Sequence, residues 1–250
     1  MFPLRDDNPT ELTPWVTLLL VGVCALVWIG IQGAGFDASA LEGSVCRFGA
    51  IPAEITGGAG GGLQGPCSPG GLTWEALVTS MFLHGGWAHL IGNLWFLWIF
   101  GNNVEDSMGH GRFLLFYLLC GLAAAGAHVV ADPSSGLPMV GASGAISGIM
   151  GAYLLLYPRA RVKTLLVLVV LLTVVELPAW VYLGYWFFLQ VGSSALQPSG
   201  AGGGVAFMAH IGGFLAGLAL VLPFRNPTLV DAKRSRVKID PGELRGRGWW

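Results

Sequence analysis

Four polar side chains that could take part in catalysis, as nucleophile, base or hydrogen-bond donor, interrupt otherwise apolar runs of this sequence: Ser143, His210, His89 and Asn93. His210 is the sixth residue of its run, which places it about 7–8 Å from the start of a helix. An ionisable side chain at that depth in a membrane is a candidate functional residue by default. A hydroxyl held beside an imidazole would combine a nucleophile with a general base. The alternative interpretation of His210 is a histidine that only hydrogen-bonds neighbouring helices.

His89 and Asn93 are four residues apart, so on a helix they share one face. Both carry hydrogen-bond donors and lie near the outer end of their run. Donors placed in this way could form an oxyanion hole, which stabilises the charge that develops only in a transition state, by about 3–4 kcal/mol per donor in a dry site. A polar pair that merely links helices is the alternative.

Ser143 stands where a membrane helix would begin, between Ala142 and Gly144. A helix from Ser143 to Tyr157 has about 15 residues and a length of about 22 Å, which is shorter than the ~30 Å hydrocarbon core of a bilayer. We therefore expect Ser143 to lie below the outer surface. Irregular backbone at that depth is tolerated only if it is buried in protein or lines a wet cavity, so the sequence predicts a cavity here.

Small residues indicate how the serine and the imidazole could meet. Gly144, Gly148 and Gly151 form a stripe at helical spacing, and Gly213 with Gly217 forms a GxxxG pattern in the run that holds the histidine. Such patterns let the backbones of membrane helices approach closely. We expect these two helices to pack together, although most glycine stripes serve packing alone.

The composition indicates a membrane protein, with 54% hydrophobic and 11% charged residues, against roughly a quarter charged in soluble domains. Six apolar runs approach or exceed the ~20 residues that a transmembrane helix needs. We predict an all-α polytopic membrane protein, a bundle of six transmembrane helices. The net charge of −1 and the lack of a basic, aromatic-interleaved patch give no indication of nucleic-acid binding. The runs cover residues 15–31, 87–101, 113–131, 139–157, 164–191 and 205–224.

The distribution of positive charge supports this count. If the amino terminus is inside, Arg47 alone of the 13 Lys and Arg residues lies outside, and the positive-inside rule then places both termini in the cytoplasm. A cleaved signal peptide is the alternative for the first run, because Arg5 precedes it and an Ala-Ser-Ala sequence follows it. The predicted organisation is a cytoplasmic segment 1–14, a six-span domain 15–224 with an outer loop 32–73, and a basic cytoplasmic tail 225–250.

Two of the four cysteines, Cys46 and Cys67, fall in the Gly-rich outer loop. An oxidising exterior permits a disulfide there, and we predict that the two are bonded to each other, although sequence alone does not establish a pairing. Cys24 and Cys120 lie in apolar runs, where small packing residues are expected.

Three motifs in order on alternate spans resemble those of the rhomboid intramembrane serine proteases, over about residues 70 to 224. They are HGGWAHLIGN from His84 to Asn93, GASG from Gly141 to Gly144, and AHIGGFLAG from Ala209 to Gly217. The resemblance implies a six-helix rhomboid-like fold and an intramembrane serine endopeptidase that needs no metal or other cofactor.

The resemblance also implies a role for each motif residue. Ser143 would be the nucleophile and His210 its general base, a dyad without a third carboxylate. His89, Asn93 and the backbone N–H of Ser143 would form the oxyanion hole. Structural support would come from Gly141 in the loop before the nucleophile, His84 at the first outer loop, Glu105 at the inner end of the second span, and Gly144, Gly213 and Gly217 in helix packing.

The sequence departs from the family pattern at three places. Ser147 stands where many members have a tyrosine that stacks on the catalytic histidine, so aromatic support must come from elsewhere. An arginine often present in the first outer loop is missing. Glu176 with Pro178 lies inside the fifth run, and we interpret the pair as a kink with a partnered carboxylate, with a substrate gate as the alternative.

Other classes of membrane protein fit less well. A zinc protease would need HExxH, which is absent, and an aspartyl protease would need two embedded aspartates, whereas Asp106 and Asp132 lie at the ends of runs. A non-catalytic rhomboid-like protein that binds or escorts membrane clients remains the alternative function. A small transporter would show discontinuous half-helices in an inverted repeat, which the sequence does not.

The expected partners are the lipid bilayer and transmembrane protein substrates. Transmembrane helices satisfy their backbone hydrogen bonds internally, so a cleavable substrate is expected to be a single-span protein whose helix is weakened by Gly or Pro. Cleavage is expected near the outer face of a bacterial plasma membrane. The sequence predicts neither the identity of the substrate nor the oligomeric state.

Overall fold

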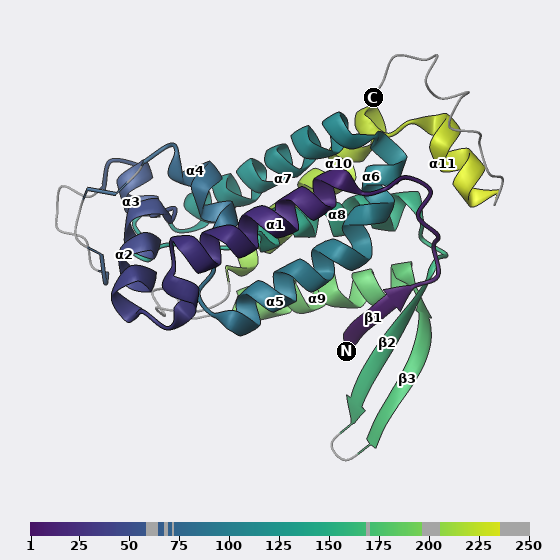
Figure 1. The fold of residues 1–250 in the computed structure, drawn as a ribbon, viewed down its shortest axis with the longest axis horizontal. Coiled ribbons are helices and arrows are strands. Elements are labelled where there is room, and N and C mark those ends of the chain that lie inside the picture. Colours follow the sequence, from purple (N-terminus) through teal and green to yellow (C-terminus); the bar gives the residue numbers. More distant parts are fainter. Residues whose placement is uncertain (59–64, 68–69, 72, 169–170, 197–205, 236–250) are drawn as a thin grey trace.

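The computed structural model describes residues 1–58, 65–67, 70–71, 73–168, 171–196 and 206–235. Long helices lie lengthwise beside one another, with short helices of the outer loop at one end and a small sheet with the last helix at the other (Figure 1). The helices of the bundle are α1 (Trp15–Gly30), α5 (Trp87–Phe96), α7 (His110–Ala131), α8 (Ser143–Leu156), α9 (Ala179–Leu196) and α10 (Phe207–Phe224). The helices at its two ends are η1 (Gly33–Gly35), α2 (Ala38–Phe48), α3 (Pro52–Ile55), α4 (Ala76–Thr79), η3 (Ser80–Phe82) and α11 (Pro227–Arg234).

The second predicted run forms a longer helical rod than expected. From α5 the chain continues through a π-helical turn, η4 (Leu97–Gly101), into α6 (Asn102–Met108). Gly109, with φ of 80°, ends the rod and lets α7 begin at the next residue, because a positive φ costs glycine little. This rod of α5, η4 and α6 carries polar side chains at both ends.

Helix α8 is the central helix of the bundle and packs tightly against α10. A Cβ atom added at Gly217 would lie 1.9 Å from the carbonyl oxygen of Gly148, and one at Gly213 would lie 2.0 Å from that of Gly144. On the α7 side, a Cβ atom at Gly148 would lie 2.4 Å from the Cβ of Cys120. Only glycine permits such backbone contact, so the close approach expected from the glycine pattern is present.

The structure is mostly helical, but it is not all-α as predicted, because the described residues also form a three-stranded antiparallel sheet in the order β1-β2-β3. Strand β1 (Phe2–Asp6) pairs with β2 (Arg161–Leu168), and β2 pairs with β3 (Leu171–Pro178). The predicted helical run at 164–191 is therefore a hairpin followed by α9. Its first part is rich in Val and Thr, whose branched side chains favour strands, whereas hydropathy does not distinguish an apolar strand from an apolar helix.

The carboxylate of Glu176 is partnered, as predicted, but it does not lie at a kink of a membrane helix. It lies in β3 opposite Lys163, with 42% of its side chain exposed. Its carboxylate is 3.1 Å from the Lys163 ammonium and 3.6 Å from the Arg161 guanidinium. This is a surface ion pair on the hairpin, a kind of pair that contributes about 0–1 kcal/mol.

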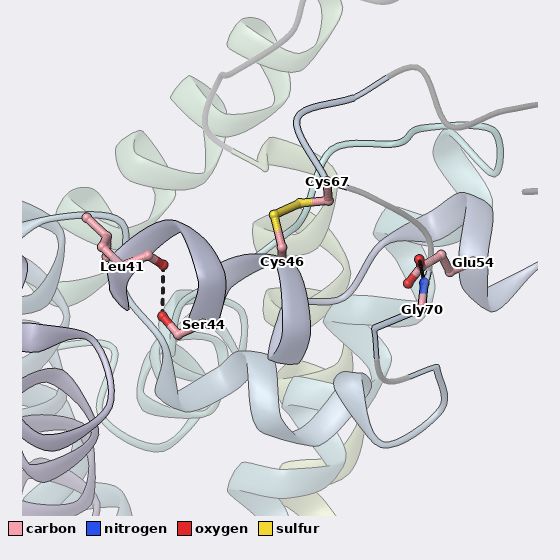
Figure 2. Close-up of a disulfide and its surroundings, with 6 residues drawn as sticks. All are labelled: Leu41, Ser44, Cys46, Glu54, Cys67 and Gly70. Carbon is pink, nitrogen blue, oxygen red and sulfur yellow. Dashed lines mark hydrogen bonds between the residues drawn. A yellow bond between two sulfur atoms is a disulfide. The ribbon is translucent and has the colours of Figure 1, made fainter. Parts of the chain in front are cut away.

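The outer loop is cross-linked by a disulfide between Cys46 of α2 and Cys67, with an S–S distance of 2.06 Å (Figure 2). The predicted pairing is confirmed. Nearby, Gly70 N–H donates to the Glu54 carboxylate at 3.1 Å. Residues 59–64, 68–69 and 72 of the Gly-rich loop lie outside the described residues.

Glu105, near the end of α6, is buried and caps the amino terminus of α1. Its carboxylate accepts hydrogen bonds from the backbone N–H groups of Val16 and Thr17, from the Thr17 hydroxyl, and contacts His110 Nδ1 at 2.6 Å. A carboxylate at this position also complements the positive end of the α1 dipole. Glu105 therefore fastens α1 to the rod.

A second polar cluster joins the sheet, the rod and α11. Lys233 Nζ donates to Asp106 at 2.8 Å and to the side-chain oxygen of Asn103 at 2.5 Å. Asp6 of β1 accepts from Asn103 Nδ2 at 2.9 Å and from the Tyr153 hydroxyl. Burial raises the pKa of Asp6 to about 6, and burial also lowers the pKa of Lys233.

Among the described residues, two helices, α7 and α10, are both long and apolar enough to cross a membrane. Helices α1 and α8 are apolar but shorter. Helix lengths alone therefore do not establish the predicted number of six spans.

Candidate active site

Ser143 and His210 are hydrogen-bonded. Ser143 is the first residue of α8, His210 lies in the first turn of α10, and the distance from His210 Nε2 to Ser143 Oγ is 2.8 Å. Gly141, with φ of 125°, turns the chain into α8, and its N–H donates to the Ser80 carbonyl at 2.8 Å. The close contact of α8 with α10 therefore brings together the serine and the imidazole, two of the residues that the sequence singled out.

His89 and Asn93 of α5 face the same place from the opposite side. A Cβ atom on Gly141 would lie 2.7 Å from His89 Nε2 and 3.6 Å from Asn93 Nδ2. His89 Nδ1 accepts the Gly85 N–H at 3.3 Å, so a neutral ring carries its proton on Nε2, which faces the loop before Ser143. Asn93 is buried, and its Nδ2 has no hydrogen-bond partner among the described residues. Two N–H donors therefore lie beside Gly141, in the loop before Ser143, and line the same cavity as the serine.

These four residues line one cavity of about 780 Å³, a size typical of binding sites. Its walls come from α4, η3, α5, α7, α8, α9 and α10, together with the loop that precedes α8. The cavity extends from the loop at Pro138 along α8 to Met150, with Phe96 and Trp186 at its sides. The cavity predicted at Ser143 is present.

Two residues of α9 that the sequence analysis missed complete the surroundings of the imidazole. Gln190 Oε1 is 2.8 Å from His210 Nδ1. The Trp186 ring lies 5.9 Å from the His210 ring, tilted by 38°. One signal was present in the sequence: a glutamine one helical turn after a tryptophan in an apolar helix.

Ser147 takes neither the role of the stacking tyrosine nor that of a nucleophile. It is buried, and its hydroxyl donates to the Ser143 carbonyl at 2.6 Å. A hydroxyl held by the preceding turn of its own helix does not face the reacting position. Trp186 supplies the aromatic contact to His210 instead.

His84 lies beside the site without entering it. Gln32, at the end of α1, holds the main chain of His84 through two hydrogen bonds of 2.8 Å, one to each backbone polar group. The His84 ring packs edge-on against the His89 ring at 5.2 Å. The structure thus places His84 between Gln32 and His89. In the part of the chain that is described, no three metal-ligating side chains converge.

A serine and a histidine that are hydrogen-bonded within a cavity of an apolar helical bundle form the kind of pair that serine hydrolases use as nucleophile and base. Comparison with known proteins agrees with this class. The family model described as the Rhomboid domain matches residues 71–227. The chain belongs to the rhomboid family, whose members are integral membrane proteins.

Several curated proteins resemble the same region. Rhomboid protease GluP of Bacillus subtilis (strain 168) is 39% identical over 153 residues, which cover 60% of this chain and 27% of GluP. Rhomboid-like protein 11, chloroplastic, of Arabidopsis thaliana is 30% identical over 157 residues, covering 59% and 51%. Rhomboid protein 1, mitochondrial, of Saccharomyces cerevisiae is 28% identical over 149 residues, covering 57% and 40%. The chain thus spans about a quarter to a half of the length of these relatives.

Proposed function

We propose that the protein is an intramembrane serine endopeptidase that hydrolyses peptide bonds of single-span membrane proteins. The observation that carries the proposal is the 2.8 Å hydrogen bond between Ser143 Oγ and His210 Nε2, inside a cavity that also holds the donors of His89 and Asn93. Relatives that include a named protease support the same activity.

In the first half-reaction, Ser143 Oγ attacks the carbonyl carbon of the scissile bond while His210 Nε2 takes the hydroxyl proton. The negative charge that develops on the carbonyl oxygen is stabilised by the N–H groups of His89 and Asn93 and by the backbone N–H of Ser143. His210 then gives its proton to the leaving amine, and the carboxyl side of the substrate stays bound as an ester of Ser143.

In the second half-reaction, water loses a proton to His210 and attacks the ester, and Ser143 recovers its proton when the acid product leaves. Peptide bonds of a regular helix are protected by internal hydrogen bonds. A substrate must therefore present an extended segment at Ser143, which favours single-span proteins with Gly or Pro near the cleaved bond.

Contacts between distant elements support a topology of six spans. Strand β1 precedes α1 and pairs with β2, which follows α8, so both strands lie on one side of the membrane and the chain crosses an even number of times between them. Arg234 of α11 donates to the carbonyls of Leu155 and Leu156 at the end of α8, which requires a further even number through α9 and α10. Four and then two crossings satisfy both conditions.

We place these ends in the cytoplasm, because positive charge concentrates there and because the disulfide of the opposite loop needs an oxidising compartment. The protein would then lie in a bacterial plasma membrane with both termini cytoplasmic, and cleavage would take place near the outer face. Residues 15–224 would form the protease domain, between the segment 1–14 and the tail 225–250, of which residues 236–250 are outside the described residues.

The alternative, a non-catalytic rhomboid-like protein that binds or escorts clients, is less well supported. Such a protein would not need the hydrogen bond between Ser143 and His210. It would not need the donors of His89 and Asn93 in the same cavity either.

The decisive experiment uses detergent-purified protein and a panel of tagged single-span proteins. Wild type should cleave at least one of them, and Ser143→Ala should abolish cleavage while its thermal unfolding is unchanged. Retained turnover in that variant would exclude Ser143 as the nucleophile.

A fluorophosphonate probe, which reacts with activated serines, separates the two other roles. His210→Ala should no longer be labelled, because the base is lost. Asn93→Ala should cleave roughly 10²–10³-fold more slowly and still be labelled slowly. Labelling of folded His210→Ala at the wild-type rate would contradict the dyad.

A further inference from the structure

The sequence motifs leave the second nitrogen of the catalytic imidazole without a partner, and the structure supplies one. Gln190 Oε1 lies 2.8 Å from His210 Nδ1, on the side of the ring opposite Ser143. We propose that Gln190 is the positioning residue of the site, the third member of a Ser-His-Gln arrangement. This inference rests on the proposed function.

The chemistry of the amide fixes the tautomer of the imidazole. A side-chain carbonyl oxygen only accepts hydrogen bonds, so its partner, His210 Nδ1, must carry the proton. In a neutral ring, Nε2 then bears the lone pair, and Nε2 is the atom that faces the Ser143 hydroxyl. This is the tautomer that a general base requires.

Gln190 also fixes the orientation of the ring, together with Trp186. The two residues are four apart on α9, so they present one face to α10. Trp186 packs against the plane of His210 at 5.9 Å and against Phe214 at 6.0 Å, while Gln190 holds its edge. Helix α9 thus provides the orientation that other members of the family obtain from the tyrosine that Ser147 replaces here.

When Ser143 attacks, His210 becomes a cation, and the hydrogen bond from Nδ1–H to Gln190 becomes charge-assisted and stronger. No proton passes to the amide, so Gln190 acts like the Asn of a Cys-His-Asn site and not as a second base. His89 lines the same cavity, and His89 and His128 of α7 are the titratable side chains that interact electrostatically with His210. A neutral orienting group is compatible with these surroundings.

The test compares two substitutions of Gln190 with a control on the same helix. Gln190→Leu keeps a similar volume and removes the acceptor, and Gln190→Glu keeps the acceptor and adds charge. Tyr185→Phe is the control, because it removes a polar group from an exposed position of α9. Cleavage of a tagged single-span protein, fluorophosphonate labelling and the temperature of unfolding are measured for each variant.

Gln190→Leu should lower kcat and the labelling rate on the order of 10²-fold and leave KM unchanged. This loss is smaller than the ~10⁴-fold loss that a fully wrong tautomer causes. Gln190→Glu should be labelled faster than Gln190→Leu. It should also move the acidic limb of the pH profile of kcat/KM to higher pH, because a carboxylate favours the imidazolium. Tyr185→Phe should behave as wild type.

A second measurement needs no substitution. In the ¹⁵N spectrum of the histidines, His210 of wild-type protein at neutral pH should show the Nδ1–H tautomer. The Nε2–H tautomer, or labelling of folded Gln190→Leu at the wild-type rate, would overturn the inference while leaving the proposed function intact. Wild type that neither cleaves nor is labelled would instead contradict the proposed function.

Discussion

The contact between Gly217 and Gly148 gives the most quantitative prediction, because it ties backbone packing to the position of the reacting groups. In Gly217→Ala, the new Cβ would lie 1.9 Å from the Gly148 carbonyl oxygen, whereas ordinary van der Waals contact begins at 3.4 Å. The three atoms nearest to this Cβ are the O, C and Cα atoms of Gly148. They belong to the backbone of a tightly packed helix, so no side chain can rotate away. Helices α8 and α10 must therefore separate by up to about 1.5 Å.

The same two helices carry Ser143 and His210, so the separation should lengthen their 2.8 Å hydrogen bond. A misplacement of ~1 Å at a reacting centre can cost ~10²-fold in rate, and overpacking a core costs about 1–3 kcal/mol of stability. We expect Gly217→Ala to cleave about 10²-fold more slowly, with a lower temperature of unfolding.

The assay compares initial rates of cleavage and of fluorophosphonate labelling in purified protein. Gly126→Ala is the matched control, since Gly126 lies in α7 and a Cβ atom there would meet nothing within 4 Å; this variant should retain wild-type rates. If Gly217→Ala labelled within twofold of wild type and unfolded at the same temperature, the close approach of α8 and α10 would not be what positions the dyad.

Two further predictions concern the ends of the bundle. Replacing Cys46 and Cys67 by serine should lower the free energy of unfolding by about 3 kcal/mol, because their bond closes a loop of 21 residues. Alkylation of the wild-type protein followed by mass spectrometry should find neither thiol free. Two free thiols under non-reducing conditions would refute the bond. Burial raises the pKa of Asp6 from 3.8 to about 6, so between these values the folded state binds more protons than the unfolded chain, and stability should fall as the pH rises from about 4 to 6. Asp6→Asn should lack this contribution to the free energy of unfolding, which reaches at most roughly 3 kcal/mol. An identical pH dependence of thermal unfolding in wild type and Asp6→Asn would contradict the prediction.

The sequence was most informative where chemistry and spacing coincide. Ser143, His210, His89 and Asn93 were expected to meet because each is a polar residue at a matching depth of an apolar run, and the structure brings their side chains to one cavity. The glycine pattern was informative for the same reason: Gly217 has one geometric consequence, backbone contact, which α8 and α10 make.

The sequence was least informative where the answer depends on a partner distant in the chain. Gln190 is a single amide in an apolar helix, and nothing local shows that it faces His210, 20 residues later. The bonds from Gln32 to the main chain of His84 span 52 residues and were missed likewise. The hairpin at 161–178 was missed because its apolar, β-branched residues satisfy the same hydropathy criterion as a transmembrane helix.

The pairing of β1 with β2 also sets an order of events in biogenesis. Phe2 is opposite Leu165, so β1 has no partner strand until about 160 further residues have been made, which at ~5–20 residues per second takes roughly 8–30 s of synthesis. In the proposed topology, the first residues stay during this time on the cytoplasmic side of the membrane, where the ribosome delivers the hairpin. The sheet can form only after α1, the rod of α5 and α6, α7 and α8 have been synthesised, and its completion then fixes the amino-terminal segment beside the hairpin.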